Sequence, residues 1–411
     1  MIFKSNINRE EFDRFVKSYP STSFMQLSNW AEIKSAWESD LVGMYDGDKL
    51  VCTALVLKRN LFFGKKLIYI PRGFVIDYKD KKLLKEFVYN LKKYAKENNA
   101  IDIKIDPFIC FGEDNIQNIK KGKNIEIRKI FTKDTKEVTD NLQELGFVHG
   151  GFKKEVNAYI QPRYTMAISL KDKDGKLYDK EALRRSFPKN TRNYIGTYQE
   201  ERGVEFNYST NPDDVKELVS VLKLTEKRQH ISLRNEKYFK KIMNNYPENT
   251  VLFFARINID KYIEFLKEDM KLNPNKEEFN RGQIEEAKRV KDKYGNKPLA
   301  GATIVMMPTC KKGIKTASFL YAGTNTDILP SLKITNGLMF YRLCYCLDKK
   351  VDYCDLGGVD GSLEDHLSVF KSKFNPNVLE LVGEYDLVLN KALYNLFNIA
   401  IKIRKFIMSK R

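Results

Sequence analysis

Two short segments each place a cation and an aromatic ring four residues apart, the spacing that puts both side chains on one face of a helix. Trp30 and Lys34 form the first pair, and Arg234 and Tyr238 form the second. A lysine is a compact point charge with three donors, whereas an arginine directs two N–H groups onto the oxygens of a phosphate. The chemistry that these residue types could carry out is therefore the binding of an anionic substrate.

The segment LRRSFPKNTRNYI, residues 183–195, concentrates positive charge and carries aromatic residues between the charges. Basic side chains bind the phosphate backbone of a nucleic acid, and aromatic rings stack on its bases. This composition suits a nucleic-acid contact through Arg184, Arg185, Lys189 and Arg192.

Other kinds of catalytic site find little support. The chain has no GxxxxGK[ST] phosphate loop and no GxSxG nucleophile elbow. Cys344, Cys346 and Cys354 cluster upstream of His366, but the first two lie in the apolar run GLMFYRLCYCL. Buried thiols are common in such runs, so core packing is favoured over a metal site. We predict neither a metal nor a cofactor.

The overall charge points to anionic partners. Lys and Arg number 72 against 54 Asp and Glu, a formal net charge of +18. Such a field suits nucleic acid, a phosphorylated substrate or an anionic membrane surface. The N-terminus has no apolar leader, and no run reaches the roughly 18 apolar residues of a membrane span. We predict a cytoplasmic protein, with peripheral association at the inner face of the membrane left open.

The elements that position these residues follow one order twice. A helical pattern at residues 29–37 precedes the hairpin LVGMYDGDKLVCTALVLK, the strand KKLIYIPRGFVI, a helix near 81–96 and the buried strand IDIKIDP. About two hundred residues later, helices near 212–228 and 237–244 precede the strands VLFFARI, PLAGATIVMMP and TASFLYAGT. A helix near 334–347 and the strand VDYCDLGG complete the second set. The recurrence predicts a duplicated α/β unit.

Two further helical segments stand outside this plan. Residues 258–297 interrupt the second unit with two helical patterns separated at Asn273-Pro274, which predicts an antiparallel helical arm. The C-terminal segment KALYNLFNIAIKIRKFIMSKR is amphipathic and basic. It suits either packing against the first unit, which is slightly favoured, or an anionic membrane surface.

Three blocks of sequence together resemble the Fem family, whose members move an amino acid from aminoacyl-tRNA onto a cell-wall precursor peptide. They are FMQLSNWAEIKSAW at 24–37, TEKRQHISLRNEKYF at 225–239 and YCDLGGVDGSLEDHLSVFKSKFNP at 353–376. Weaker matches are IPRGFVIDY near Arg72, IKIDP ending at Asp106-Pro107, FLYAGT with Tyr321, and the basic segment 183–195, which is similar to a linker between domains. The resemblance covers residues 24 to about 384 and rests on the order and spacing of the blocks.

The resemblance also implies roles for individual residues. Lys34, on one helix face with Trp30, would hold the diphosphate of the precursor, and Arg234 would contact the sugar-nucleotide or lipid diphosphate. Tyr238 and Tyr321 would face the same cleft, and Arg72 lies in a further matching block. Lys371 would lie beside the reacting ester and the terminal tRNA nucleotide. Its neighbour Phe370 is a candidate for substrate binding, although a core position is slightly favoured for it.

The general base is a separate question. Asp106 ends a strand that would face the cleft, so it is a candidate base; a purely structural strand-end carboxylate is the favoured alternative. Proton transfer assisted by the substrate itself is a third possibility.

The expected fold is α/β, with two tandem GNAT-like domains around a shared cleft. The first would span residues 1–160, completed by 381–411, the second 161–380, and the arm 258–297. The expected activity is transfer of Gly, Ala or Ser from aminoacyl-tRNA to the stem-peptide amine of a lipid-linked or UDP-linked muramyl pentapeptide. The rivals are an N-acyltransferase that uses acyl-CoA, although no Gly-rich pyrophosphate turn is present, and a non-enzymatic protein that binds tRNA or membranes.

Overall fold

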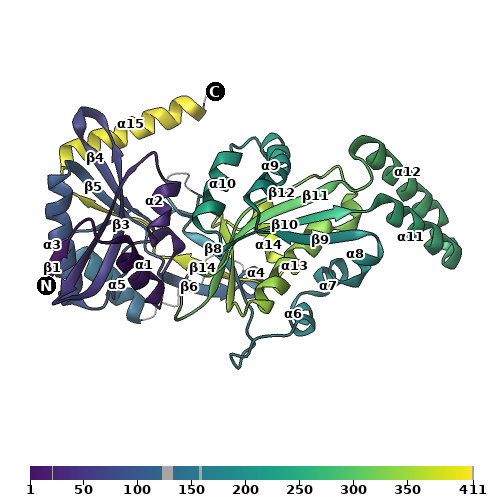
Figure 1. Cartoon of the computed structure of the whole chain (residues 1–411), viewed down its shortest axis with the longest axis horizontal. Helices are drawn as coiled ribbons and strands as arrows, with labels where there is room; N and C mark the ends of the chain where they lie inside the picture. The colour runs from purple at the N-terminus through teal and green to yellow at the C-terminus, as the bar shows by residue number, and fades with distance from the viewer. Residues whose placement is uncertain (21, 123–132, 157–159, 410–411) are drawn as a thin grey trace.

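The computed structural model describes residues 1–20, 22–122, 133–156 and 160–409, which form two α/β units side by side (Figure 1). Within these residues, the first unit is built on a mixed sheet of seven strands. Their order is β1 (Ile2–Lys4), β2 (Glu38–Asp46), β3 (Lys49–Asn60), β4 (Lys66–Ile70), β5 (Ala100–Ile105), β15 (Tyr385–Val388) and β7 (Val148–His149).

The second unit is built on a mixed sheet of eight strands. Their order is β6 (Cys110–Asn115), β14 (Asn377–Leu381), β8 (Tyr164–Ser169), β13 (Tyr353–Val359), β12 (Thr316–Thr324), β11 (Leu299–Met306), β10 (Thr250–Ile257) and β9 (Val204–Ser209). The two mixed sheets and their helices confirm the predicted α/β class and its two tandem units.

Each sheet contains one parallel pair at the corresponding place. Strands β4 and β5 are parallel and joined by α3 (Lys81–Glu97), and β12 and β13 are parallel and joined by α13 (Ile334–Asp348). Parallel neighbours require such a crossover, whereas the hairpin β2–β3 turns at the predicted Asp46-Gly47. The pairing of β12 with β13 covers only Thr316–Ser318 and Tyr353–Asp355. Beyond these residues the two strands diverge.

The chain exchanges strands between the units. Strand β6 follows the first unit in sequence but pairs with β14 at the edge of the second sheet. Strand β15, close to the C-terminus, pairs with β5 and β7 in the first sheet. Each sheet is therefore completed by a segment from the other half of the chain.

Helices cover both sheets with their apolar faces. In α3, Leu84, Phe87, Val88 and Leu91 are fully buried at the helical spacing that the sequence showed. Cys344 and Cys346 on α13 and Cys354 on β13 are also buried, as core packing requires. The remaining helices of the first unit are α1 (Arg9–Ser18), α2 (Asn29–Ile33) and α5 (Lys133–Glu144). Helix α4 (Ile116–Lys121) follows β6 and buries Ile116 and Ile119 in the core of the second unit.

In the second half of the chain, α9 (Val215–Gln229) and α10 (Glu236–Asn245) lie beside the junction of the units. Short helices α6 (Lys180–Ser186), α7 (Lys189–Tyr194) and α8 (Thr197–Glu201) follow β8, and α14 (His366–Ser372) follows β13. Helices α11 (Ile259–Leu272) and α12 (Glu277–Tyr294) pack on each other at the end of the molecule farthest from the first unit (Figure 1).

The last helix, α15 (Lys391–Ser409), packs on the first unit, the arrangement that the sequence slightly favoured. The hydroxyl of Tyr394 donates to Asp386 of β15 at 2.7 Å. Lys410 and Arg411, which the sequence placed at the basic end of this helix, lie outside the described residues. Of the helices in the described ranges, none combines the length and the apolar character needed to cross a bilayer.

Candidate functional site

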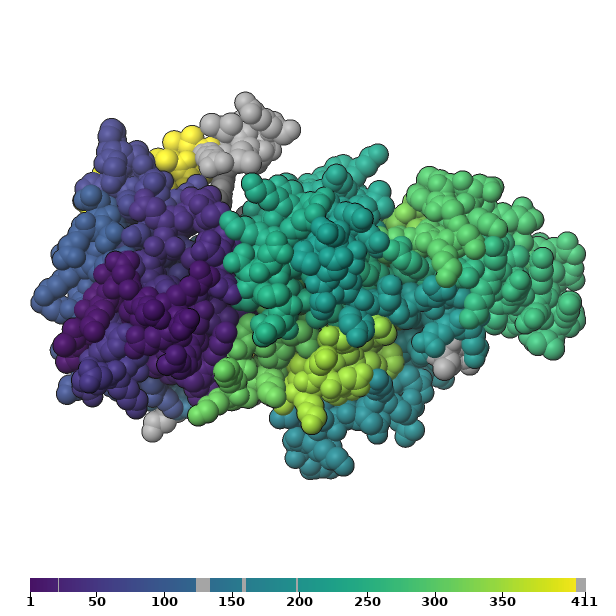
Figure 2. All heavy atoms as spheres, in the orientation of Figure 1, coloured from purple at the N-terminus to yellow at the C-terminus, as the bar shows by residue number. Residues whose placement is uncertain are grey.

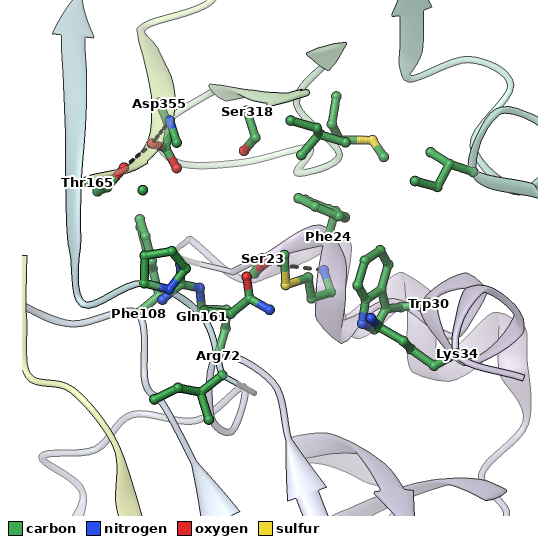
Figure 3. A pocket seen from close by; sticks show the side chains of 18 of the residues that line it. Ser23, Phe24, Trp30, Lys34, Arg72, Phe108, Gln161, Thr165, Ser318 and Asp355 are labelled. Atoms are coloured by element: carbon green, nitrogen blue, oxygen red, sulfur yellow. Dashed lines mark hydrogen bonds between the residues drawn. The ribbon is translucent and has the colours of Figure 1, made fainter. Parts of the chain in front are cut away.

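A cleft of about 910 Å³ lies where the two units meet. Figure 2 shows the two units in contact along this junction, and Figure 3 shows side chains that line the cleft from both. The fold brings together predicted residues that lie far apart in the sequence. Those that line the cleft are Trp30, Lys34, Arg72, Arg234, Tyr238 and Tyr321.

Lys34 reaches the cleft from the end of a short helix. Helix α2 stops at Ile33, earlier than the helical pattern through residue 37 suggested, and Lys34 is its C-terminal cap. The Lys34 Nζ lies 5.0 Å from the centroid of the Trp30 ring, and Figure 3 shows the two side by side. Trp30 is in turn fixed by an edge-on contact with Phe24 at 5.4 Å. The lysine is therefore held by an aromatic surface, with its charge left available.

Gln26, which belongs to the same block, explains why this helix sits where it does. Its amide donates to the Pro71 carbonyl at 2.6 Å and accepts from the Leu55 N–H at 2.9 Å. Because Gln26 is buried, these two bonds attach the start of the block to β3 and to the turn after β4. Its role is to position Trp30 and Lys34.

Arg234 approaches from the second unit, just before α10. Asn235 caps that helix by accepting from the Tyr238 N–H at 3.0 Å, and the Arg234 guanidinium lies 5.1 Å from the centroid of the Tyr238 ring. Tyr238 also packs edge-on against Tyr321 at 6.5 Å between ring centroids. Burial raises the pKa of the Tyr238 phenol, so its hydroxyl stays protonated and can donate a hydrogen bond.

Two cations thus face one cavity without neutralisation. In the described part of the chain, no carboxylate forms an ion pair with Lys34 or with Arg234. Burial, followed by repulsion from Arg234, lowers the pKa of Lys34 to about 8. Such an arrangement costs free energy until an anion enters, and a lysine together with a forked arginine suits a diphosphate.

Asp106 is fully engaged at its strand end. Its carboxylate accepts from the Tyr69 hydroxyl at 2.8 Å, the Arg72 N–H at 2.6 Å and the Gln161 N–H at 2.9 Å. Burial raises its pKa, while Arg72 and these hydrogen bonds act in the opposite direction. The bond to Arg72 holds that residue at a φ of 61°, with its guanidinium 5.1 Å from the Phe108 ring. The geometry is that of a structural carboxylate.

Lys371 lies behind the cleft lining. Its side chain is 5% exposed, and Nζ donates to the carbonyls of Gly357 and Gly358 at 2.9 Å each. Burial lowers its pKa to about 8, although Asp355 and Asp365 act in the opposite direction. Phe370 packs edge-on against Phe374 at 5.7 Å, beside the core of the second unit. The structure therefore brings neither Lys371 nor Phe370 onto the surface formed by Lys34 and Arg234.

The two glycine carbonyls belong to a turn that does line the cleft. Gly357 has a φ of 83°, and a Cβ there would lie 3.1 Å from the Phe319 carbonyl oxygen, so the position requires glycine. The ammonium of Lys371 holds this turn from behind. Its observed contacts are those of a positioning residue.

Asp355, in the block at residues 353–376, has no role implied by the resemblance, yet it lines the cleft. One carboxylate oxygen, Oδ1, accepts from the Thr165 hydroxyl and from the Gly357 N–H at 2.9 Å. No group within the described ranges donates to Oδ2. Figure 3 shows Asp355 and Thr165 across the cavity from Arg72 and Phe24. A carboxylate oriented through one oxygen and free at the other can accept a proton.

The predicted nucleic-acid residues lie away from this cleft, on α6 and α7. Arg184 donates to Glu181 at 2.7 and 2.8 Å, and Arg185 donates to the same carboxylate at 3.0 Å. Arg192 donates to the carbonyls of Arg185 and Phe187 at 3.1 Å each. Lys189 is exposed. Arg192 thus stabilises the link between the two helices, while Arg185 and Lys189 present charge to solvent.

Comparison with known proteins places this architecture in one family. The FemAB family matches residues 7–282 and 271–402. The chain is 27% identical to the lipid II:glycine glycyltransferase of Staphylococcus haemolyticus, over 96% of this chain and 94% of that protein. It is 25% identical to the aminoacyltransferase FemA of Staphylococcus aureus, over 97% and 98%.

Among solved structures, that of FemX superposes with a TM-score of 0.73 at 23% identity, over 96% of this chain and 99% of that one. This likeness concerns the fold, whereas the family match extends over both units and includes every residue that lines the cleft, from Pro20 to Ile401. The prediction of a Fem-type aminoacyltransferase is confirmed at the level of family and enzyme class: the chain belongs to the FemAB family.

Proposed function

We propose that this protein transfers a small amino acid, Gly, Ala or Ser, from aminoacyl-tRNA to the stem-peptide amine of a lipid-linked muramyl peptide. The observation that carries the proposal is the pair of cations Lys34 and Arg234, which line one cleft with Tyr238 and have no ion-pair partner among the described residues. Two relatives bear the names of a lipid II:glycine glycyltransferase and an aminoacyltransferase, which supports this class of acceptor and of reaction.

In this proposal, the diphosphate of the acceptor lies between Lys34 and Arg234. The aminoacyl end of the tRNA enters where β12 and β13 diverge, beside Asp355 and the Gly357 turn. Both ends of the reaction then share one cleft, so that most of the acceleration comes from holding amine and ester together.

The chemical step is the aminolysis of an ester, which runs downhill and needs no ATP. The neutral amine nitrogen adds to the ester carbonyl, and the proton that it loses passes to Oδ2 of Asp355. The bond between the carbonyl carbon and the ribose oxygen then breaks, and that oxygen takes the proton from Asp355. The products are an amide and a tRNA with a free terminal hydroxyl, and the carboxylate is restored.

The test is transfer from labelled glycyl-, alanyl- and seryl-tRNA onto lipid-linked and UDP-linked muramyl pentapeptide, with acyl-CoA as a rival donor. We expect transfer from at least one of the aminoacyl-tRNAs to the lipid-linked acceptor, and none from acyl-CoA. Transfer from acyl-CoA in the absence of tRNA, or from no aminoacyl-tRNA to either acceptor, would contradict the proposal.

A further inference from the structure

Helix α15 has a second apolar face that the fold does not cover. Leu396, Ile399 and Ile403 are spaced by three and four residues, so they share one side of the helix. Their exposed fractions are 50%, 54% and 55%, which is high for large aliphatic side chains in a helix that packs on a sheet.

The opposite side of the same helix accounts for its packing. Phe397 and Ile401 line the cleft, and the Tyr394 hydroxyl binds Asp386 on β15. The helix therefore needs no help from Leu396, Ile399 or Ile403 to attach to the first unit. These three residues form what we call the outer stripe.

A second exposed apolar group lies at the same edge of the molecule. Phe63, at the tip of the β3–β4 hairpin, is 87% exposed and has a left-handed φ of 53°. A bulky residue in the left-handed conformation costs about 1 kcal/mol or more. Because the Phe63 ring is exposed, its burial does not offset that cost. Lys65 and Lys66 follow Phe63 in the sequence, and Arg59 and Lys58 precede the tip.

The hairpin and α15 leave the first sheet at the same end of its central strands β4 and β5. Lys66 at the base of the hairpin pairs with Ala100, and the N–H of Asn390, just before α15, donates to the carbonyl of Ile101 at 3.1 Å. Figure 1 shows both segments along the upper side of the molecule, and Figure 2 shows α15 in yellow beside that part of the first unit.

Charge indicates what could cover this edge. Residues 391–411 contain six Lys or Arg and no Asp or Glu. By contrast, residues 259–294 also expose large apolar side chains, Leu272 and Phe279, but contain nine basic and nine acidic residues. A helix that carries an apolar stripe, and whose sequence contains basic but no acidic residues, matches an anionic lipid surface, where apolar side chains enter the acyl boundary and Lys or Arg bind headgroups.

We propose that the outer stripe of α15 and the Phe63 hairpin tip together form a docking surface for an anionic lipid bilayer. The surface lies next to the cleft, because the other face of α15 lines that cavity. Docking would hold the cleft beside membrane-embedded substrate, and this purpose rests on the lipid-linked acceptor of the proposed function. The binding itself does not depend on it.

The experiment is flotation of the full chain with vesicles that contain neither precursor nor tRNA. Vesicles of phosphatidylcholine alone are compared with vesicles that also contain phosphatidylglycerol. We expect binding to the mixed vesicles only, weakened by salt, because the headgroup attraction is screened. Replacing the outer stripe (L396S, I399S and I403S together), or F63S alone, should weaken binding about tenfold or more.

The matched control is L272S with F279S, which removes apolar side chains that are more exposed than the outer stripe from the charge-balanced α11–α12 pair and should bind as the unchanged protein does. Equal binding by the stripe variant, or no binding to mixed vesicles by the unchanged protein, would overturn the proposal. A stripe that instead joins two copies, seen as a dimer that the stripe variant abolishes without vesicle binding, would also overturn it. Because no substrate is present, each of these results leaves the proposed transfer reaction untouched.

Discussion

At the scale of single residues, the two predicted lysines differ in what surrounds them. Burial is the first cause of the lowered pKa, about 8, of both Lys34 and Lys371. The buried ammonium group of Lys371 is stabilised by hydrogen bonds to two backbone carbonyls. Lys34 instead lies near a second cation, Arg234, which repels its charge. Two cations held close together in an open cavity lower the stability of the fold, so their arrangement indicates a site for an anionic ligand.

The first prediction concerns Lys34→Met. Between pH 8 and the ordinary pKa of about 10.4, the unfolded chain binds a proton at Lys34 that the folded chain does not, so stability rises with pH across that window and is lowest below it. The substitution removes that cost, and the melting temperature at pH 7 should not fall. The KM for the acceptor should rise about tenfold or more, because only one cation then remains to bind the diphosphate.

The same linkage predicts a pH effect on the unchanged protein. Lys34 loses its proton as the pH rises through about 8, so the KM for the acceptor should increase above that pH. Lys34→Arg, which stays charged, should flatten this rise. The KM for the acceptor is measured by steady-state kinetics from about pH 6 to 9.5, the range in which Lys34 titrates. A KM that does not depend on pH in either protein would contradict the assignment of Lys34 to diphosphate binding.

The second prediction separates the two carboxylates. Asp355→Asn keeps an oxygen for Thr165 and Gly357 but removes the proton acceptor, so kcat should fall about a hundredfold with little change in unfolding free energy. Asp106→Asn sets an amide N–H₂ against backbone or hydroxyl donors and should cost about 1–3 kcal/mol of stability.

Urea unfolding and single-turnover rates at saturating substrate measure both variants. The assignment fails if Asp106→Asn abolishes transfer at unchanged stability while Asp355→Asn transfers at the normal rate.

At the scale of elements, the turn after β13 connects Lys371 to the cleft. Lys371→Met leaves the carbonyls of Gly357 and Gly358 without their donor, and the turn should lose its shape. We expect a kcat lower by about tenfold or more at unchanged affinity for tRNA, since a misplaced reacting group is costly. A filter-binding assay beside the transfer assay measures both, and unchanged transfer would show that the turn does not depend on this ammonium.

Helices α6 and α7 carry the fourth prediction. Arg185→Gln with Lys189→Gln should weaken tRNA binding and reduce the slope of log affinity against log salt by about 1 for each phosphate that is no longer neutralised. Transfer at saturating tRNA should be unchanged, because these residues lie outside the cleft lining. Lys288→Gln with Lys291→Gln on α12 removes the same charge elsewhere. If it has an equal effect, tRNA responds to the general field of the protein and not to these two helices.

The elements also show how far sequence reasoning reached. The succession of the main strands along the chain and the helices that became α3 and α13 followed from periodicity. Lys34, Arg234, Tyr238 and Tyr321, which all line the cleft, were named from the resemblance of ordered motifs to the Fem family. The position of Lys371 did not, because a motif specifies a residue and not the side of a turn from which it binds. Asp355 also could not be singled out from the sequence, because its carboxylate is oriented by Thr165, a residue 190 positions away.

At the scale of the whole molecule, the exchange of strands makes the two units depend on each other. Strand β5 pairs with β15, and β14 pairs with β6, so each sheet is completed by a segment from the other half of the chain. Ion pairs reinforce one of these joins: Lys104 of β5 binds Glu384 at 3.2 Å, and Lys153 binds the same carboxylate at 2.6 Å. The Lys104 and Lys153 ammonium groups hold the pKa of Glu384 below its ordinary value, although burial opposes this.

The last prediction follows from this exchange. The full chain should unfold in a single calorimetric transition, because neither sheet is complete without both halves of the chain. A chain ending at residue 383 lacks β15 and α15, which exposes the edges of β5 and β7 and should lower the melting temperature of the first unit strongly. In the full-length chain, Glu384→Gln should lower the melting temperature less than the truncation does. It should do so only above the pH at which the Glu384 carboxylate ionises. Two separate transitions in the full chain would mean that the units fold independently and that the strand exchange only joins them.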